Sequence, residues 1–149
     1  FFFEIEKSLG IFFGGLKHKD TNYFITKSWA TYTEKNKFIA THEHVASQFS
    51  FVYYVQINED HSPLTFYEPK TRFYMPESTE WNDDNFQSMS YGCTPGMLVV
   101  FPSHLFHGTQ KVNKTDVPRI SISGDIMITA KPGVVTENLI PHPSTWRAI

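Results

Sequence analysis

The feature that most constrains the fold of this chain is a succession of short extended segments separated by turns, with few helical signals. Segments 47–57, 96–102 and 119–130 are rich in aromatic and β-branched residues, which favour strands over helices. The stretches between them carry the Pro, Gly and Asn residues that are typical of turns. About eight strands are expected, and this pattern favours an all-β sandwich or jelly roll with scarcely any helix.

The order of segments and turns also predicts how some strands pair. Segments 22–33 and 38–44 are expected to be two strands joined by a turn at 34–37. Segment 64–68 follows segment 47–57 after a short polar break, and we expect these two to form a hairpin.

A long segment, residues 69–95, is rich in Pro and Asn and is expected to run as a loop over the sheet. Loops of this length in small domains are usually functional or mobile, so we expect a lid that shapes a substrate pocket. Trp81 and Phe86 are candidate lid aromatics, although packing against the sheet is the simpler role for each.

Length, charge and cysteine content exclude several classes of protein. The 149 residues are expected to form one domain, residues 1–149, with a hydrophobic core that needs no disulfides. A net charge of −2 without a Lys/Arg stripe argues against nucleic-acid or membrane-surface binding. No apolar run approaches the roughly 20 residues of a membrane span. The single cysteine, Cys93, excludes an internal disulfide and fits a reducing, cytoplasmic compartment.

Two histidines one residue apart suggest a metal site. Alternate residues of a strand project to the same face, so His42 and His44 would point one way and Glu43 the other. The third ligand should come from a distant strand, and His107, at the end of the apolar segment 96–107, is the best candidate. Gly108 beside it would let a ligand or cofactor approach the backbone. Hydrogen-bonded or exposed histidines without a metal are the simpler alternative.

The remaining histidines are weaker candidates. His104 differs from His107 by an odd number of positions, so in an extended segment it would face the other way. His18, His61 and His142 lie in polar or Pro-rich surroundings and are expected at the surface.

Segment 119–123 places a cation on a strand. Arg119 and Ser121 share one face, whereas Ile120 and Ile122 share the other. If the polar face points into the barrel, the buried guanidinium needs an anionic partner, and a bidentate carboxylate is the natural one. If the isoleucines point inward instead, Arg119 is solvated; parity alone does not decide between the two.

The motifs THEH, FSFVYYVQI, SPLTFYEP, PGMLVVFPSHLFHGTQ and RISISGDI resemble those of the Fe(II)- and 2-oxoglutarate-dependent dioxygenases. The resemblance is greatest to a small group from marine phages and bacteria, runs from about residue 29 to residue 126, and extends more distantly to prolyl hydroxylases. It implies a double-stranded β-helix, which is a jelly roll, and the cofactors Fe(II) and 2-oxoglutarate. It also implies oxidation of the co-substrate to succinate and CO₂ while a substrate C–H bond is hydroxylated.

The resemblance further implies roles for individual residues. Iron would be held by the first motif together with His107. Arg119 would pair with the distal carboxylate of 2-oxoglutarate, and Tyr54 would hydrogen-bond the same carboxylate. Thr65 and Ser121 are further candidates for this pocket.

The first motif departs from the family, in which the second position is usually Asp or Glu. Here that position is His44, and a site of three imidazoles, His42, His44 and His107, is expected to bind the iron. Two alternatives stay open. A carboxylate from elsewhere, such as Glu68, would complete the site in place of His44, or His44 would be the first ligand, with Ala46 leaving a vertex for chloride as in related halogenases.

The predicted function is therefore a hydroxylase that acts on a small-molecule or peptide substrate in a bacterial or phage-infected cell. A homodimer is one of the oligomeric states left open. The alternative is a non-catalytic jelly-roll binding module or phage structural module, and a cupin-like metalloenzyme that uses no 2-oxoglutarate comes third. An inward-facing Arg119 discriminates among these, because only the hydroxylase needs a cation there.

Overall fold

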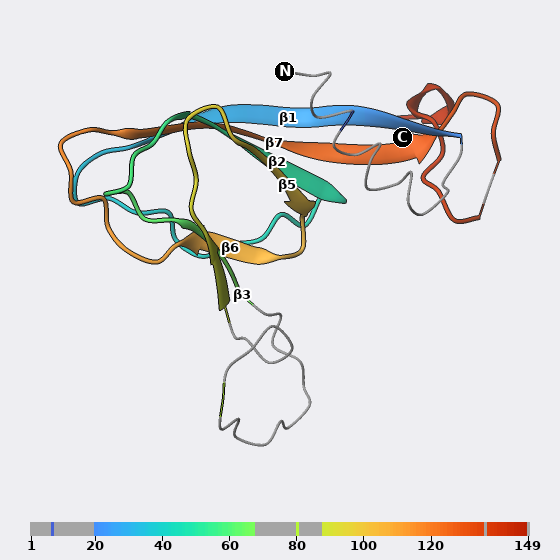
Figure 1. Ribbon diagram of the computed structural model, residues 1–149. Helices are drawn as coiled ribbons and strands as arrows, with labels where there is room; N and C mark the ends of the chain where they lie inside the picture. Colours follow the sequence, from blue (N-terminus) through green and yellow to red (C-terminus); the bar gives the residue numbers. More distant parts are fainter. Residues whose placement is uncertain (1–6, 8–19, 68–79, 81–87, 136, 149) are drawn as a thin grey trace.

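The strands of this protein form two facing antiparallel layers, as Figure 1 shows. The computed structural model describes residues 7, 20–67, 80, 88–135 and 137–148. The strands in this part of the chain are β1 (Thr21–Thr33), β2 (Phe49–Gln56), β3 (Leu64–Tyr67), β4 (Ser88–Tyr91), β5 (Leu98–Pro102), β6 (Phe106–Thr109) and β7 (Arg119–Ala130). A short 3-10 helix, η1 (Pro143–Thr145), follows them.

One sheet has the strand order β1-β7-β2-β5, and the other has the order β4-β3-β6. Every pairing between these strands is antiparallel. Two such layers agree with the predicted sandwich or jelly roll. Among the described residues, no helix is long and apolar enough to cross a membrane. The assignment of residues 1–149 to one domain stays a prediction.

Strand β2 runs through the centre of the larger sheet and is buried on both of its faces. Val52 and Tyr54 on one face pack with Leu64 and Phe101 in the core between the sheets. Phe51 on the other face packs against Ile126 of β7. Aromatic and β-branched residues suit such a strand, because they pack well on a pleated surface.

Three predicted features of strand pairing are wrong. Segment 64–68 does not form a hairpin with β2, because β3 pairs with β4 and β6 in the other sheet. Segment 38–44 forms no strand and contributes an isolated bridge between His42 and His107. His107 does not end the strand that contains Leu98, because a turn after Pro102 separates β5 from β6 and carries the chain into the second sheet. Alternation within a segment indicates its two faces but not its partner.

The turn predicted at 34–37 is confirmed. The Lys37 backbone N–H donates to the Glu34 carbonyl at 3.1 Å, and Asn36 has a φ of 64°. Asn tolerates this left-handed conformation better than most residues. Strand β4 lies inside the predicted 69–95 loop. Several residues singled out in the sequence lie outside the described residues. They are His18, Glu68 and the candidate lid aromatics Trp81 and Phe86.

Candidate metal centre

His42 and His107 face each other across two adjacent backbone segments. The His42 N–H donates to the His107 carbonyl at 3.0 Å, and the His107 N–H donates to the His42 carbonyl at 2.9 Å. Gly108 permits this approach, because a Cβ there would lie 2.8 Å from the carbonyl oxygen of Ile39 and 3.1 Å from Cα of Thr41. The close approach expected at Gly108 is therefore made by the chain's own backbone.

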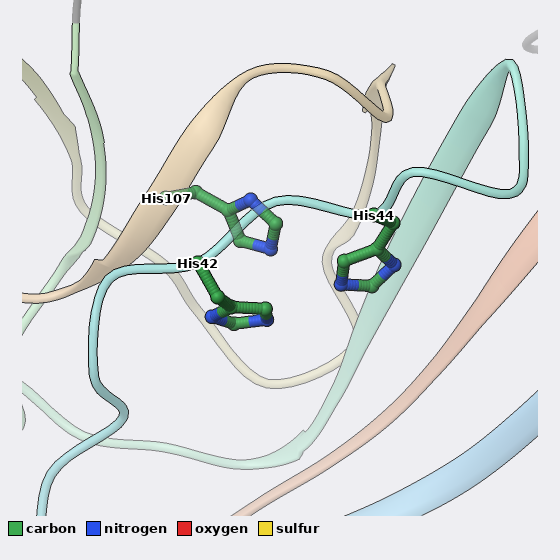
Figure 2. A group of neighbouring side chains, drawn as sticks. All are labelled: His42, His44 and His107. Carbon is green, nitrogen blue, oxygen red and sulfur yellow. The ribbon is translucent and has the colours of Figure 1, made fainter.

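His44 joins this pair from the same segment as His42. Its backbone N–H donates to the Ser103 carbonyl at 2.9 Å, which ties it to the turn between β5 and β6. One ligating nitrogen from each of the three rings lies within 4.8 Å of those of the other two. Figure 2 shows the three rings turned toward a common space. The structure thus brings together His42, His44 and His107, as the sequence predicted, and the identity of what they hold stays a proposal.

The second nitrogen of each ring is already engaged. Nδ1 of His42 lies 2.8 Å from the Ala40 carbonyl oxygen, and Nδ1 of His107 lies 2.8 Å from that of Leu105. Nδ1 of His44 contacts a carboxylate oxygen of Asp125. All three partners accept hydrogen bonds, so each Nδ1 carries a proton, and in the neutral ring Nε2 keeps a lone pair. This is the tautomer that a metal-binding histidine needs.

Asp125 was not among the residues predicted from the sequence. It is 1% exposed, and its Oδ1 also accepts a hydrogen bond from the Ser50 hydroxyl at 2.9 Å, while Oδ2 lies 2.9 Å from Nζ of Lys27. Burial raises the pKa of this carboxyl, but hydrogen bonds from His44, Lys27 and Ser50 outweigh it and hold the pKa below its ordinary value. A signal existed in the sequence, since Asp125 continues the alternation begun by Arg119.

His107 is the most buried of the three histidines. Burial, with a smaller contribution from the neighbouring His42 and His44, lowers the pKa of its imidazole to about 4, against a raising effect of the Leu105 carbonyl and Asp125. At neutral pH the ring is therefore uncharged, which is the form that binds a metal ion.

Arg119 points into the protein, which settles the question that parity left open. It is 3% exposed, and Ser121 on the same face is 1% exposed. Its Nη2 donates to the Tyr54 hydroxyl at 3.3 Å, and the guanidinium lies 5.0 Å from the centre of the Tyr54 ring. Among the described residues, its buried Nε and Nη1 have no hydrogen-bond partner. A buried cation with two free donors is a site for an anion.

The histidines and Arg119 line one cavity. It has a volume of about 90 Å³, below the roughly 300–1,000 Å³ typical of small-molecule sites, and it is partly open to solvent. Further lining residues are Trp29, Thr31, Val52, Phe101, Ser121 and Ser123. The same cavity is thus lined by three histidines and by the guanidinium of Arg119, which has two donors to spare.

The other candidate cofactor-binding residues are placed differently. Tyr54 is fully buried behind Arg119, and burial raises the pKa of its hydroxyl although Arg119 acts to lower it. Thr65 is also fully buried, and its hydroxyl bonds Ser90, 2.9 Å away on β4. Neither Tyr54 nor Thr65 is among the residues that line the cavity.

The weaker histidine candidates do not join the three-histidine cluster. His104 is exposed, and His142 hydrogen-bonds Ser144 near the end of the chain. The surface position expected for His61 is wrong, because it is 6% exposed. Its Nδ1 accepts from the Asn58 N–H at 2.9 Å, and its Nε2 lies 2.9 Å from the Val117 carbonyl oxygen. A histidine in a polar loop is buried here because it satisfies backbone groups.

A family model described as "Putative 2OG-Fe(II) oxygenase" matches residues 27–125 of the chain. This match covers more than half of the chain and includes the three histidines, Arg119 and Asp125. A search of curated proteins found no match.

Two solved structures are similar in fold. An oxidoreductase of the 2OG-Fe(II) oxygenase family from Burkholderia pseudomallei is 19% identical with a TM-score of 0.57, over 82% of this chain and 57% of that one. The non-heme alpha ketoglutarate dependent epimerase SnoN from nogalamycin biosynthesis is 16% identical with a TM-score of 0.54, over 85% and 58%. The chain thus spans less than two thirds of either structure. At these identities the likeness concerns the fold, and it confirms the predicted jelly roll.

Proposed function

The chain belongs to the 2OG-Fe(II) oxygenase family, and we propose that it is a hydroxylase that uses Fe(II) and 2-oxoglutarate to oxidise an unactivated C–H bond. The observation that carries this proposal is one cavity that is lined both by the three histidines and by the buried guanidinium of Arg119, two donors of which have no partner among the described residues. A non-catalytic binding module would have no need for both.

The donor set fits Fe(II). Imidazole nitrogen is a good ligand for iron, and three ligands on one side leave positions for a co-substrate and O₂. His42, His44 and His107 would hold the ion through Nε2, because Nδ1 of each ring already has a partner. The halogenase alternative, in which Ala46 leaves a vertex for chloride, loses support because His42 lies with the other two histidines. Glu68, the alternative carboxylate ligand, is not among the described residues.

The unpaired donors of Arg119 fit 2-oxoglutarate. Its distal carboxylate would accept hydrogen bonds from Nε and Nη1, the two buried donors without a partner. Tyr54 would act on the same end of the molecule by bonding Nη2 and by holding the guanidinium plane against its ring. Ser121, buried on the same face of β7, is a further candidate for a contact with this carboxylate. Thr65 is a weaker candidate, because its hydroxyl bonds Ser90, whereas that of Tyr54 bonds Arg119.

When bound, Fe(II) and 2-oxoglutarate supply the oxidation, in which O₂ and the co-substrate convert a C–H bond to an alcohol with release of succinate and CO₂. The residues of this chain do the positioning. Arg119 would orient the co-substrate through its two free donors. Apolar side chains such as Val52 and Phe101 exclude water around it, which strengthens the ion pair.

The substrate is proposed to be a small molecule or a peptide, which enters from the side of the cavity that is open to solvent. Trp29 lines the cavity next to His44, with 5.4 Å between the ring centres, and is the first residue to test for a substrate contact. A cytoplasmic location of a bacterial or phage-infected cell is proposed for the enzyme, supported by the lone Cys93.

The experiment that tests the proposal measures turnover of 2-oxoglutarate. Purified protein loaded with Fe(II) and supplied with ascorbate as the reductant is expected to convert 2-oxoglutarate and O₂ slowly to succinate, CO₂ and water in the absence of substrate. His107→Ala should lose this turnover, whereas His104→Ala, which removes an exposed histidine three positions away, should keep it. If the Fe(II)-loaded wild type shows no 2-oxoglutarate binding by titration calorimetry, the proposal is wrong.

A further inference from the structure

We propose that Asp125 is a positioning residue for the metal centre, which locks His44 in its ligating tautomer and supplies the negative charge that three imidazole ligands lack. This inference rests on the proposed function, because it assigns to Asp125 a role at the same iron site. A carboxylate in the second position of the motif would place that charge directly on the metal. Here the carboxylate of Asp125 instead contacts the ring of the ligand His44.

The position of Asp125 is fixed by strand register. In the larger sheet, β7 lies between β1 and β2, and Asp125 is paired with Lys27 on one side and with Ser50 on the other. The register between β1 and β7 shifts between Ile25 and Lys27, and this irregularity sets Lys27 opposite Asp125. Side chains of paired residues lie close together. The carboxylate is therefore held from both sides by the sheet before His44 contacts it.

Hydrogen-bond chemistry then fixes the proton on His44. An ionised carboxylate only accepts hydrogen bonds, so Nδ1 of His44 must donate to Oδ1 of Asp125. The Ser50 hydroxyl is oriented by two further serine hydroxyls. Its oxygen lies 2.8 Å from that of Ser103, and the Ser47 hydroxyl donates to Ser103 at 2.8 Å. The result is a carboxylate–imidazole pair whose other nitrogen, Nε2, faces the metal position.

His44 differs in this respect from its two neighbours. His42 and His107 direct Nδ1 to neutral backbone carbonyls, whereas His44 directs it to a charge. A carboxylate partner raises the basicity of a ligating imidazole more than a carbonyl does. Lys27 does not cancel this effect, because its side chain is 58% exposed and its ion pair is screened by solvent.

A purely structural role for Asp125 makes a different prediction. If it served only to join β1, β7 and β2, its replacement would lower stability and leave the metal affinity of the folded protein unchanged. The two roles are separated by Asp125→Asn, which keeps the size and shape of the side chain and removes the charge. Asp116→Asn is the matched control, since this carboxylate forms an exposed ion pair with Lys35, with a side chain that is 89% exposed.

The test measures Co(II) binding to the full chain, freed of metal, by calorimetry and by the visible spectrum of the bound ion. We expect Asp125→Asn to bind Co(II) roughly 10- to 100-fold more weakly than the wild type and to give a shifted spectrum, while Asp116→Asn matches the wild type in both. A variant that is folded by circular dichroism and binds Co(II) as tightly as the wild type, with the same spectrum, overturns the proposal.

A measurement on the wild type keeps the proposal testable if Asp125→Asn does not fold. In metal-free protein labelled with ¹⁵N-histidine, the nitrogen chemical shifts should place the proton of His44 on Nδ1. A proton on Nε2 overturns the proposal. These results are distinct from failure of the proposed function: a wild type that binds Co(II) without 2-oxoglutarate turnover contradicts the hydroxylase alone, whereas a wild type that binds no metal contradicts both.

Discussion

The backbones of His42 and His107 hydrogen-bond each other in both directions, at 3.0 and 2.9 Å. Each residue also directs Nδ1 to the carbonyl oxygen of the residue two positions before it, Ala40 for one and Leu105 for the other. The two rings are thus oriented by the same local geometry on two segments that are distant in sequence. Because their orientation is set by backbone groups, the two side chains are positioned before any metal binds.

Loss of any one of the three histidines should weaken metal binding more than loss of a residue, such as Asp125, that only hydrogen-bonds a metal ligand. We expect each of the alanine variants His42→Ala, His44→Ala and His107→Ala to bind Fe(II) more weakly by a larger factor than the roughly 10- to 100-fold loss that is typical when a residue hydrogen-bonded to a ligand is replaced. Anaerobic calorimetric titration measures the affinity. His104→Ala serves as the control and should bind like the wild type; retained affinity in His42→Ala would favour a site without this residue.

Arg119→Met should separate stability from cofactor binding. The cofactor-free variant is expected to melt at or above the wild-type temperature, because it replaces a buried cation that has two unpaired donors with an apolar side chain. Its affinity for 2-oxoglutarate should fall by roughly 2–5 kcal/mol, or about 30-fold or more. Thermal melting with and without 2-oxoglutarate measures both effects. A variant still stabilised by 2-oxoglutarate as much as the wild type would remove Arg119 from the carboxylate site.

Tyr54 should make the cofactor-free protein sensitive to alkaline pH. Burial raises the pKa of its hydroxyl above the unfolded value of about 10, so the folded state retains a proton that the unfolded state releases above that pH. The stability contributed by this group is therefore present below pH 10 and declines as pH rises further. Urea unfolding of the wild type and Tyr54→Phe at pH 8–11 measures it, and the stability difference between them should shrink only above about pH 10. Parallel curves would contradict the prediction.

Gly124 should not tolerate a side chain. A Cβ at this position would lie 2.6 Å from two ring carbons of Phe51, which is 1% exposed, and 2.7 Å from the Lys27 carbonyl oxygen. Gly124→Ala is expected to lower the free energy of unfolding by about 1–3 kcal/mol through overpacking. Gly92→Ala is the control, because nothing lies within 4 Å of a Cβ there, and its effect should stay within about 0.5 kcal/mol. Equal stabilities by urea titration would show that Phe51 can move aside.

Much of the site was predictable because alternation along a strand is a local property. Parity placed Arg119 and Ser121 on one face, and the structure buries both. The same rule, extended to Asp125, would have placed its carboxylate on that face, although not against His44. Polar surroundings misplaced His61 at the surface, because burial of a loop histidine depends on which backbone groups need a partner, and those groups belong to Asn58 and to the distant Val117.

The sequence by itself determined where the chain is extended and which residues of a segment share a face, since φ/ψ preferences and a two-residue period act within a few residues. Tertiary structure alone decided which strands are neighbours: β3 joined β4 and β6 instead of β2, and β6 carried His107 to His42. It also decided that the carboxylate of Asp125 meets His44. Those contacts depend on register and packing between segments far apart in the chain, which no local pattern specifies.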